Sequence, residues 1–200
     1  MRLAVVAALI CACAAPAAAQ VAPPPPSMAV GHPWDGRLVH GVQLPEAGPG
    51  FITWDEVLRR SPNRGNRRWG TQQLLTMLET VASEFAVAHR DLPPLLISDL
   101  SRPNGGPFGE EYGGLGHATH QNGRDADVMY PRRDRALLAP TRPSQVDRAL
   151  AQDLVDRFRR AGAVKLYVGP HLHLRGPRKV VIALAHHDDH VHVRIPNPPK

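Results

Sequence analysis

The sequence predicts a single domain of the α+β class. Two helical segments and several short β-type runs follow one another without the regular strand–helix–strand alternation of a parallel α/β fold. Pro and Gly are frequent, at 21 and 17 of 200 residues, which favours a loop-rich domain over a helical bundle. The hydrophobic share of 42% is that of a globular chain with a real core.

The amino-terminal segment has the pattern of a secretory signal peptide over residues 1–19. Arg2 precedes an apolar run, and small residues at 17–19 form the expected cleavage pattern. Cys11 and Cys13 both lie within it, so we expect a mature chain without disulfides. A lipoprotein acylated at Cys13 is the alternative. We expect a periplasmic or secreted protein without a membrane span, because no other segment approaches about 20 apolar residues.

A Pro-rich stretch at 20–35 is predicted to be an extended linker, and residues 36–200 to be the folded domain. The formal charge is +6, but the arginines are scattered and aromatic residues make up only 5%, which argues against a nucleic-acid partner. We interpret the basic charge as a solvated surface. The sequence leaves the oligomeric state open.

The first helix is predicted to begin at Thr71, a good N-cap, and to end near His89. Apolar residues recur at helical spacing along one face: Leu74, Leu75, Leu78, Val81, Ala82 and Phe85. Residues 94–100 then read as a buried strand. The following segment, 101–116, is too rich in Gly and Pro for regular structure and is predicted to be a loop.

A second helix is predicted from Ser144 onward. Its expected inner face consists of Val146, Ala149, Leu150, Leu154 and Phe158. Three short β-type runs follow, broken by Gly and Pro, at 164–168, 180–185 and 191–195.

Potential metal ligands occur first in the segment "HATHQNGRDAD". His120 and Asp127 would stand about 10 Å apart along a helix, and on opposite faces of a strand. To share a metal, the chain between them must curl back, and Gly123 is the residue that tolerates such a bend. Asp127 then opens a short strand, 127–130, with Asp125 projecting from the same face.

A second cluster lies at the head of the alternating strand "VHVRI". His190 and His192 project from one face, about 7 Å apart at the backbone. One imidazole can bind a metal while the other reaches a water beside it, or both can be ligands. The pair His171 and His173 also alternates, but it follows a probable turn and no acidic residue flanks it, so we interpret it as surface or structural.

Together the clusters offer two His and one Asp, or three His and one Asp. A catalytic zinc site typically has three nitrogen and oxygen ligands and keeps one position for water. Sulfur ligands are absent, which argues against a structural Cys-rich zinc site.

These motifs carry a family resemblance. The segment "SRPNGGPFGEEYGGLGHATHQNGRDADVMY" (101–130) resembles the His-x6-Asp signature of the LAS-type metallopeptidases. The combination of "GGxF…GHATHQxGxDxD" with "HxxHVHVR" is similar to the penicillin-insensitive murein endopeptidases, with further matches at 36–45 and 66–70, so that the likeness spans about 36–195. One position differs: Ala118 stands where such proteins often have Ser, which would remove a hydroxyl contact near the site.

The resemblance implies a LAS/hedgehog-type fold, a small antiparallel sheet with flanking helices and long loops. It implies one zinc per chain, held by His120, Asp127 and His192. It places His190 beside the metal-bound water, as a base or transition-state stabiliser, and His117 and His187 around the same cavity. An imidazole suits proton transfer because its unperturbed pKa is about 6.5.

Three further residues are candidates for supporting roles. The carboxylates of Asp125 and Asp189 can orient imidazoles through hydrogen bonds. The guanidinium of Arg102 can bind a substrate carboxylate.

The leading hypothesis is therefore a secreted zinc endopeptidase that cuts peptide cross-links in peptidoglycan, such as the D-alanyl–diaminopimelate bond. The alternatives are a zinc carboxypeptidase that removes the terminal D-alanine of the same stem peptide, and a zinc-containing cell-wall binding module without activity. Retention of His187 and His190 speaks against the binding module.

Overall fold

The computed structural model describes residues 23–109 and 117–197. The expected signal peptide at 1–19, with both cysteines, lies outside these residues, as does much of the predicted loop at 101–116. Of that loop, residues 101–109 form no strand or helix, as predicted.

The described chain opens with a β-hairpin. Strand β1 (Met28–His32) pairs antiparallel with β2 (Asp35–Val39), and Pro33 and Trp34 form the turn. Part of the segment 20–35 that we expected to be a linker is thus paired. Backbone hydrogen bonds between the two strands, together with burial of Pro33, explain why this stretch forms a paired hairpin and not an unpaired linker.

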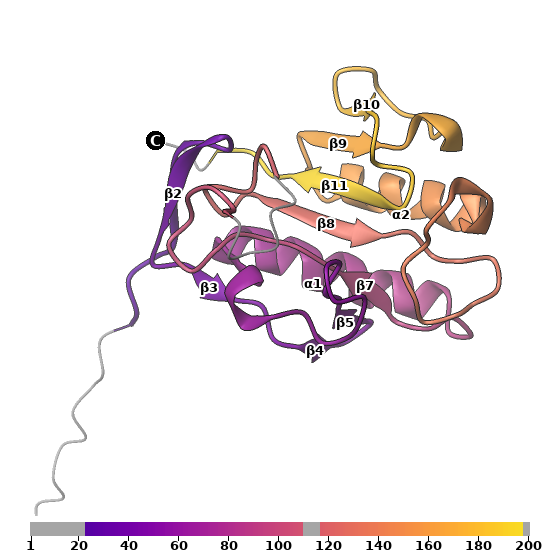
Figure 1. Cartoon of the computed structure of the whole chain (residues 1–200), viewed down its shortest axis with the longest axis horizontal. Helices are drawn as coiled ribbons and strands as arrows, with labels where there is room; N and C mark the ends of the chain where they lie inside the picture. Colours follow the sequence, from indigo (N-terminus) through magenta and orange to yellow (C-terminus); the bar gives the residue numbers. More distant parts are fainter. Residues whose placement is uncertain (1–22, 110–116, 198–200) are drawn as a thin grey trace, which may run out of the picture.

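A seven-stranded sheet forms the centre of the molecule, in the order β10-β9-β11-β8-β7-β5-β4 (Figure 1). Its strands are β4 (Ala47–Gly48), β5 (Phe51–Thr53), β7 (Leu95–Ile97), β8 (Asp125–Met129), β9 (Lys165–Val168), β10 (Val181–Ala183) and β11 (His190–Arg194). Outside it, β3 (Val42–Gln43) pairs with β6 (Trp69–Gly70).

The α+β class is confirmed, but the expectation of a small antiparallel sheet is wrong. The sheet is mixed, because β5 runs parallel to β7 and β9 runs parallel to β10. Parallel neighbours need a long crossover connection. Helix α1 (Gln72–Ala88) lies between β5 and β7 in the chain and supplies one such connection.

Helix α1 forms as predicted. Thr71 is its N-cap, and the Thr71 hydroxyl accepts a hydrogen bond from the backbone N–H of Leu74 at 3.3 Å. The helix ends at Ala88, with His89 as C-cap. All six residues of the predicted apolar face are buried.

Helix α2 (Arg148–Arg160) begins later than Ser144. Its N-cap is Asp147, whose carboxylate accepts hydrogen bonds from the backbone N–H groups of Ala149 and Leu150. Ser144 lies in a 3-10 turn (Pro143–Gln145), followed by an extended Val146. Ala149 is exposed, because at about 100° per residue it lies on the side of the helix away from Leu154 and Phe158. Its assignment to the inner face is wrong, whereas Leu154 and Phe158 are buried as predicted.

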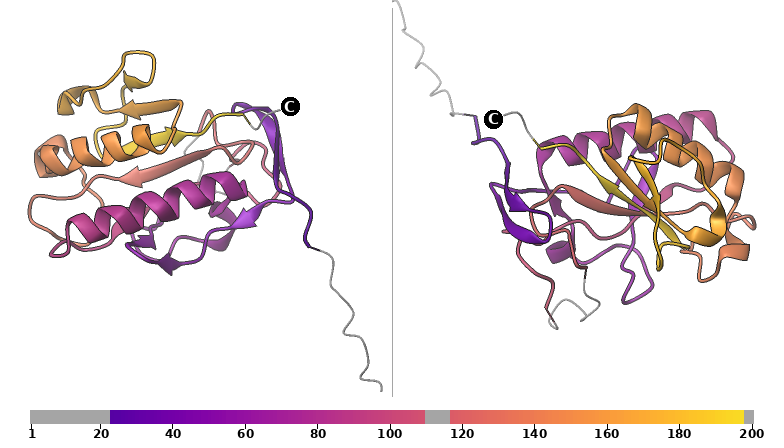
Figure 2. Two further views of the ribbon diagram at one scale, coloured as in Figure 1. Left: turned by 180° about the vertical axis from the view of Figure 1, so that it is seen from behind. Right: turned by 90° about the horizontal axis from the view of Figure 1, so that it is seen from above.

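Both helices cover the same face of the sheet. Figure 1 shows them behind it, and the views in Figure 2 from behind and from above agree. Alternate residues of β8 and β11 belong to the core on this side: Ala126, Val128, Val191 and Val193. The intervening residues, which include Asp127 and His192, therefore point to the other face, where loops instead of helices lie in front of the sheet.

Two more 3-10 turns, Gly65–Arg67 and Pro170–Leu172, complete the described elements. Neither helix of the described chain combines the length and the apolar character needed to cross a membrane.

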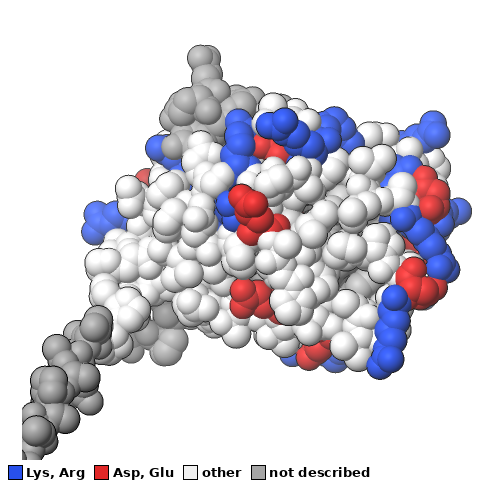
Figure 3. Space-filling model, turned by 90° about the horizontal axis from the view of Figure 1, so that it is seen from below, with Lys and Arg blue, Asp and Glu red and all other residues white. Residues whose placement is uncertain are grey.

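Basic side chains on one side of the molecule stand mostly along its rim. Figure 3 shows Lys and Arg gathered at the edge and at one end of this face, several of them beside Asp or Glu, with separate acidic patches nearer its middle. Arg135 and Asp91 form one exposed ion pair of the surface, at 2.6 Å. On this face the basic charge forms no continuous stripe.

Candidate metal centre

The pairing of two strands fixes the base of the site. β8 and β11 run antiparallel with Asp127 directly opposite His192, so both side chains leave the same face of the sheet. The Nδ1 of His192 lies 3.1 Å from Oδ1 of Asp127. The other ring nitrogen of His192, Nε2, is 2.8 Å from Oδ1 of Asp125, which also accepts from Arg194. Asp125 thus orients the His192 ring.

A tight loop brings His120 to the same place. His120 has φ +71° and Gly123 has φ +74°, so the chain curls back between His120 and Asp127. A Cβ on Gly123 would also stand only 2.7 Å from Leu38. The bend predicted at Gly123 is confirmed, and it explains how residues seven apart can share one centre.

His120 is completely buried, and its hydrogen bonds define its tautomer. Its Nδ1 lies 2.9 Å from the carbonyl oxygen of Leu100, which can only accept, so Nδ1 carries the proton. Nε2 then presents a lone pair 3.4 Å from Oδ2 of Asp127 and makes no hydrogen bond within the described residues. A buried lone pair facing a carboxylate is unfavourable unless a cation lies between them. The donor set therefore fits a metal ion.

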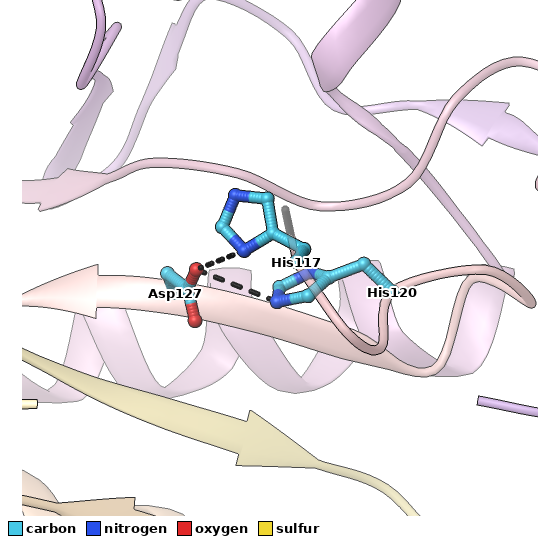
Figure 4. A group of neighbouring side chains, drawn as sticks. All are labelled: His117, His120 and Asp127. Atoms are coloured by element: carbon cyan, nitrogen blue, oxygen red, sulfur yellow. Dashed lines mark ion pairs between the residues drawn. The ribbon is translucent and has the colours of Figure 1, made fainter. Parts of the chain in front are cut away.

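His117 approaches Asp127 from the loop side. His117, His120 and Asp127 each offer one ligand atom, and these atoms all lie within 4.8 Å of one another. Figure 4 shows the two imidazoles facing the carboxylate. This trio includes His117, whereas the set implied by the family resemblance includes His192, which also reaches Asp127. His120 and Asp127 belong to both sets.

A buried network holds His117. Its Nε2 is 2.7 Å from Oδ2 of Asp99, while its Nδ1 is 3.5 Å from Asp127. Asp99 is only 1% exposed and is itself held by the buried guanidinium of Arg67 and by the side-chain amide of Asn63. His117 therefore has the same arrangement as His192, with one nitrogen on a supporting carboxylate and the other toward Asp127.

The remaining two histidines border the centre. The Nδ1 of His190 is 2.7 Å from Oδ1 of Asp189, and its Nε2 is 3.6 Å from Asp127. The ring of His187 lies 4.8 Å from that of His190, between centroids, and its Nδ1 donates to the carbonyl of Ala185. Asp189 thus supports His190, as expected for an orienting carboxylate.

A cavity of about 700 Å³ opens onto these groups. Its wall includes six of the sequence-predicted site residues together with residues that sequence reasoning missed. The lining consists of Glu56, His117, Ala118, Thr119, Asp127, Tyr167, Leu184, Ala185, His186, His187, Asp189, His190 and His192.

Arg102 does not join them. Its Nη1 donates to the carbonyl of Pro107 at 2.5 Å, within its own loop, and the residue does not line the cavity. His171 also lies apart. It is 72% exposed in its side chain, in agreement with a surface role, but it pairs in space with Asp188 at 2.6 Å.

The electrostatic environment differs between the imidazoles. Burial lowers the pKa of His120 and favours its neutral form. Burial also acts to lower the pKa of His192, but hydrogen bonds to Asp125 and Asp127 outweigh it and raise the pKa to about 9. The pKa of His190 is likewise raised, because neighbouring carboxylates overcome burial. Burial acts to raise the pKa of Asp127, but the surrounding imidazoles hold it well below its usual value.

Three functional candidates were not found from the sequence: Asp99, Glu56 and Tyr167. Burial raises the pKa of Glu56, whose carboxylate accepts from the indole N–H of Trp54. The Tyr167 ring packs 5.3 Å from that of His192, between centroids. These residues come from separate strands and turns without a short motif, so only the folded chain relates them to the histidines.

Comparison with known proteins agrees with this geometry. The profile of a family described as penicillin-insensitive murein endopeptidase matches residues 29–174. A protein of Haemophilus influenzae named penicillin-insensitive murein endopeptidase is 33% identical over 99 residues. The aligned segment covers 50% of this chain and 30% of that relative, so the match spans less than a third of the relative's length.

Proposed function

The chain belongs to the penicillin-insensitive murein endopeptidase family, and on this basis we propose that it is a secreted, zinc-dependent endopeptidase that hydrolyses peptide cross-links of peptidoglycan, such as the D-alanyl–diaminopimelate bond. One structural observation carries the proposal. The buried lone pair of His120 Nε2 faces the Asp127 carboxylate inside a cavity lined by further imidazoles, an arrangement that a cation would complete.

We assign His120, Asp127 and His192 as the residues that would hold one zinc ion per chain. The opposed positions of Asp127 and His192 in the β-ladder support this set, because backbone pairing fixes both residues. When bound, zinc would supply Lewis acidity to a carbonyl oxygen and activate water near neutral pH. His117 contacts Asp127 from the loop side and would form the edge of the site there.

The chain's own acid–base group in this proposal is His190. Its Nδ1–H donates to Asp189, so in the neutral imidazole Nε2 carries the lone pair and is turned toward the centre. Nε2 would take the proton of the attacking water and later give it to the amine leaving group. His187, beside it, would contribute a second polar contact to the reacting peptide.

The proposal also accounts for the substrate region. A murein peptide would occupy the cavity of about 700 Å³, where its polar groups meet imidazoles and Tyr167. Because water is the nucleophile, a β-lactam would find no side chain to acylate.

Digestion of purified peptidoglycan tests the function. We expect the zinc-loaded protein to convert dimeric cross-linked muropeptides to monomers, equally well with and without penicillin, as measured by chromatography of the digest. His190→Ala should abolish most of this conversion. His173→Ala, a change at an exposed histidine outside the cavity, is the matched control and should retain it.

Other outcomes favour the alternatives. Release of free D-alanine from uncross-linked pentapeptide, with dimers left intact, would indicate a carboxypeptidase. Unchanged muropeptides in the presence of stoichiometric zinc would indicate a binding module.

A further inference from the structure

A smaller hollow of about 270 Å³ adjoins the catalytic cavity. Its wall is formed by Thr141, Arg142, Pro143, His186, Asp188 and Asp189. His186 and Asp189 also line the large cavity, so the two spaces adjoin each other at these residues. A peptide bound in the cavity would therefore lie next to the hollow.

The wall that carries Arg142 is a pre-formed turn. The side-chain oxygen of Gln145 accepts hydrogen bonds from both the backbone N–H and the hydroxyl of Thr141, at 2.8 and 3.1 Å. The backbone N–H of Gln145 donates to the carbonyl of Arg142 at 3.1 Å, and Pro143 further restricts the backbone. Little ordering of this turn is then needed on binding, which favours affinity.

The two carboxylates that line the hollow are anchored as well. Asp188 accepts hydrogen bonds from the backbone N–H and the ring Nδ1 of His171, at 3.2 and 2.6 Å. Asp189 is held against His190. The Asp188 and Asp189 side chains are 23% and 33% exposed, so both carboxylates keep access to the hollow.

The charges of the two walls are opposite. Arg142 is the only Lys or Arg among the residues that line either space. Within the part of the chain that the structure describes, its guanidinium makes no ion pair or side-chain hydrogen bond. A lone carboxylate entering the hollow would meet repulsion from Asp188 and Asp189, and a lone ammonium would meet Arg142. A group that carries both charges satisfies both walls.

We propose that the hollow is a subsite for the free α-amino acid head group of a diamino acid in the stem peptide. The Arg142 guanidinium binds the carboxylate of this head group through paired N–H donors. Asp188 and Asp189 bind its ammonium. The subsite rests on the proposed function, because a murein peptide must occupy the neighbouring cavity. Diaminopimelate carries such a head group at the end of its side chain, whereas lysine ends in an ammonium alone.

Calorimetric titration with a tripeptide tests the subsite independently of cleavage. The probe is L-alanyl-γ-D-glutamyl-diaminopimelate, which lacks D-alanine and is therefore no substrate for either peptidase reaction. The comparison ligands are the same tripeptide with the side-chain carboxylate amidated, and its lysine counterpart. We expect the wild-type protein to bind the free tripeptide about ten- to a hundredfold more tightly than either, the usual scale for a charge-assisted contact.

Arg142→Gln should remove this preference by weakening binding of the free tripeptide alone. Arg178→Gln makes the same charge change at an exposed position that lines neither space, and it should keep the preference. Equal affinities for the three tripeptides in the wild-type protein, or an unchanged preference in Arg142→Gln, would overturn the subsite. If the preference follows Arg142 but no dimer is cleaved, the subsite stands and the endopeptidase proposal fails.

Discussion

At the scale of single residues, hydrogen bonds decide what each imidazole can do. His120 donates through Nδ1 to a carbonyl and His190 donates through Nδ1 to a carboxylate, so each turns Nε2 toward the centre. His192 does the reverse, because Asp125 binds its Nε2 and leaves Nδ1 facing Asp127. Supporting carboxylates and carbonyls of this kind fix ring orientation and tautomer. Neighbouring histidines can therefore have different roles.

Substitutions of His190 and His192, the two histidines of β11, should have different effects on zinc content and activity. His192→Ala removes a proposed ligand and should lower both zinc content and activity. His190→Ala should keep the zinc and lose about 10²–10⁴-fold in rate, the usual scale for acid–base assistance. Elemental analysis alongside a muropeptide assay measures both quantities. Loss of zinc in His190→Ala would show that both are ligands, and loss of zinc in His117→Ala with retention in His192→Ala would transfer the ligand role to His117.

The buried carboxylate of Asp99 should contribute far more to stability than an exposed one. Asp99→Asn leaves the Arg67 guanidinium buried opposite a neutral amide, and such changes cost about 3–5 kcal/mol. Urea denaturation measures the loss. Asp91→Asn breaks the exposed pair with Arg135 and should leave the midpoint unchanged, since surface pairs contribute little. Equal midpoints for the two variants would contradict this prediction.

At the scale of elements, the position of a cap determines where a helix begins. Ser144 and Asp147 are both N-cap residue types, but only Asp147 accepts hydrogen bonds from N–H groups of the first turn of α2. Val146 is buried in an extended conformation beside Arg132, which prevents the helix from starting earlier. Packing of the segment before α2 therefore determines that Asp147, and not Ser144, is the N-cap, although both residue types are suited to that position.

Removal of the Asp147 cap should destabilise the protein measurably. Asp147→Ala leaves two N–H groups of the first turn without their side-chain acceptor and should cost about 1 kcal/mol of unfolding free energy. Ser144→Ala, at an exposed residue whose side chain caps nothing, is the control and should stay within about 0.5 kcal/mol. Thermal and urea unfolding followed by circular dichroism measure both. A larger effect at Ser144 would mean that the helix starts there in solution.

At the scale of the whole molecule, the sheet divides structural from chemical functions. Its helix-covered face holds the main apolar core, and its loop-covered face holds the candidate metal ligands and the cavity that they line. The loop that carries His120 is anchored from outside as well, because Gln121 donates to the carbonyl of Pro33 in the β1–β2 turn and Asn122 donates to Gly31. The amino-terminal hairpin is thereby part of the support of the site.

Metal binding should stabilise the entire fold. Zinc bound to the folded state at a hundred times its dissociation constant adds about 2.7 kcal/mol, because the ligands come together only when β8, β11 and the His120 loop are in place. Differential scanning calorimetry should show a melting temperature several degrees higher with zinc than after chelation. His192→Ala should lose this shift, whereas His171→Ala should keep it. If zinc raised the melting temperature of neither the wild-type protein nor His171→Ala, this result would argue against a metal site.

The sequence by itself determined those features that depend on local pattern. The alternation of β11, the apolar face and Thr71 cap of α1, and the bend at Gly123 all follow from spacing and residue type. The motifs around His120 and Asp127 identified the family, and the structure brings these residues together.

Only the tertiary structure decided which distant groups support and extend the site. Arg102 was a candidate for binding a carboxylate; in the fold its guanidinium donates to the carbonyl of Pro107, and Arg142 lines the adjoining hollow from a different turn. The contact of Asp99 with His117, the place of Glu56 in the cavity and the parallel strand pairs likewise join segments far apart in the chain. Such contacts depend on the register and packing of the complete sheet, which no short stretch of sequence encodes.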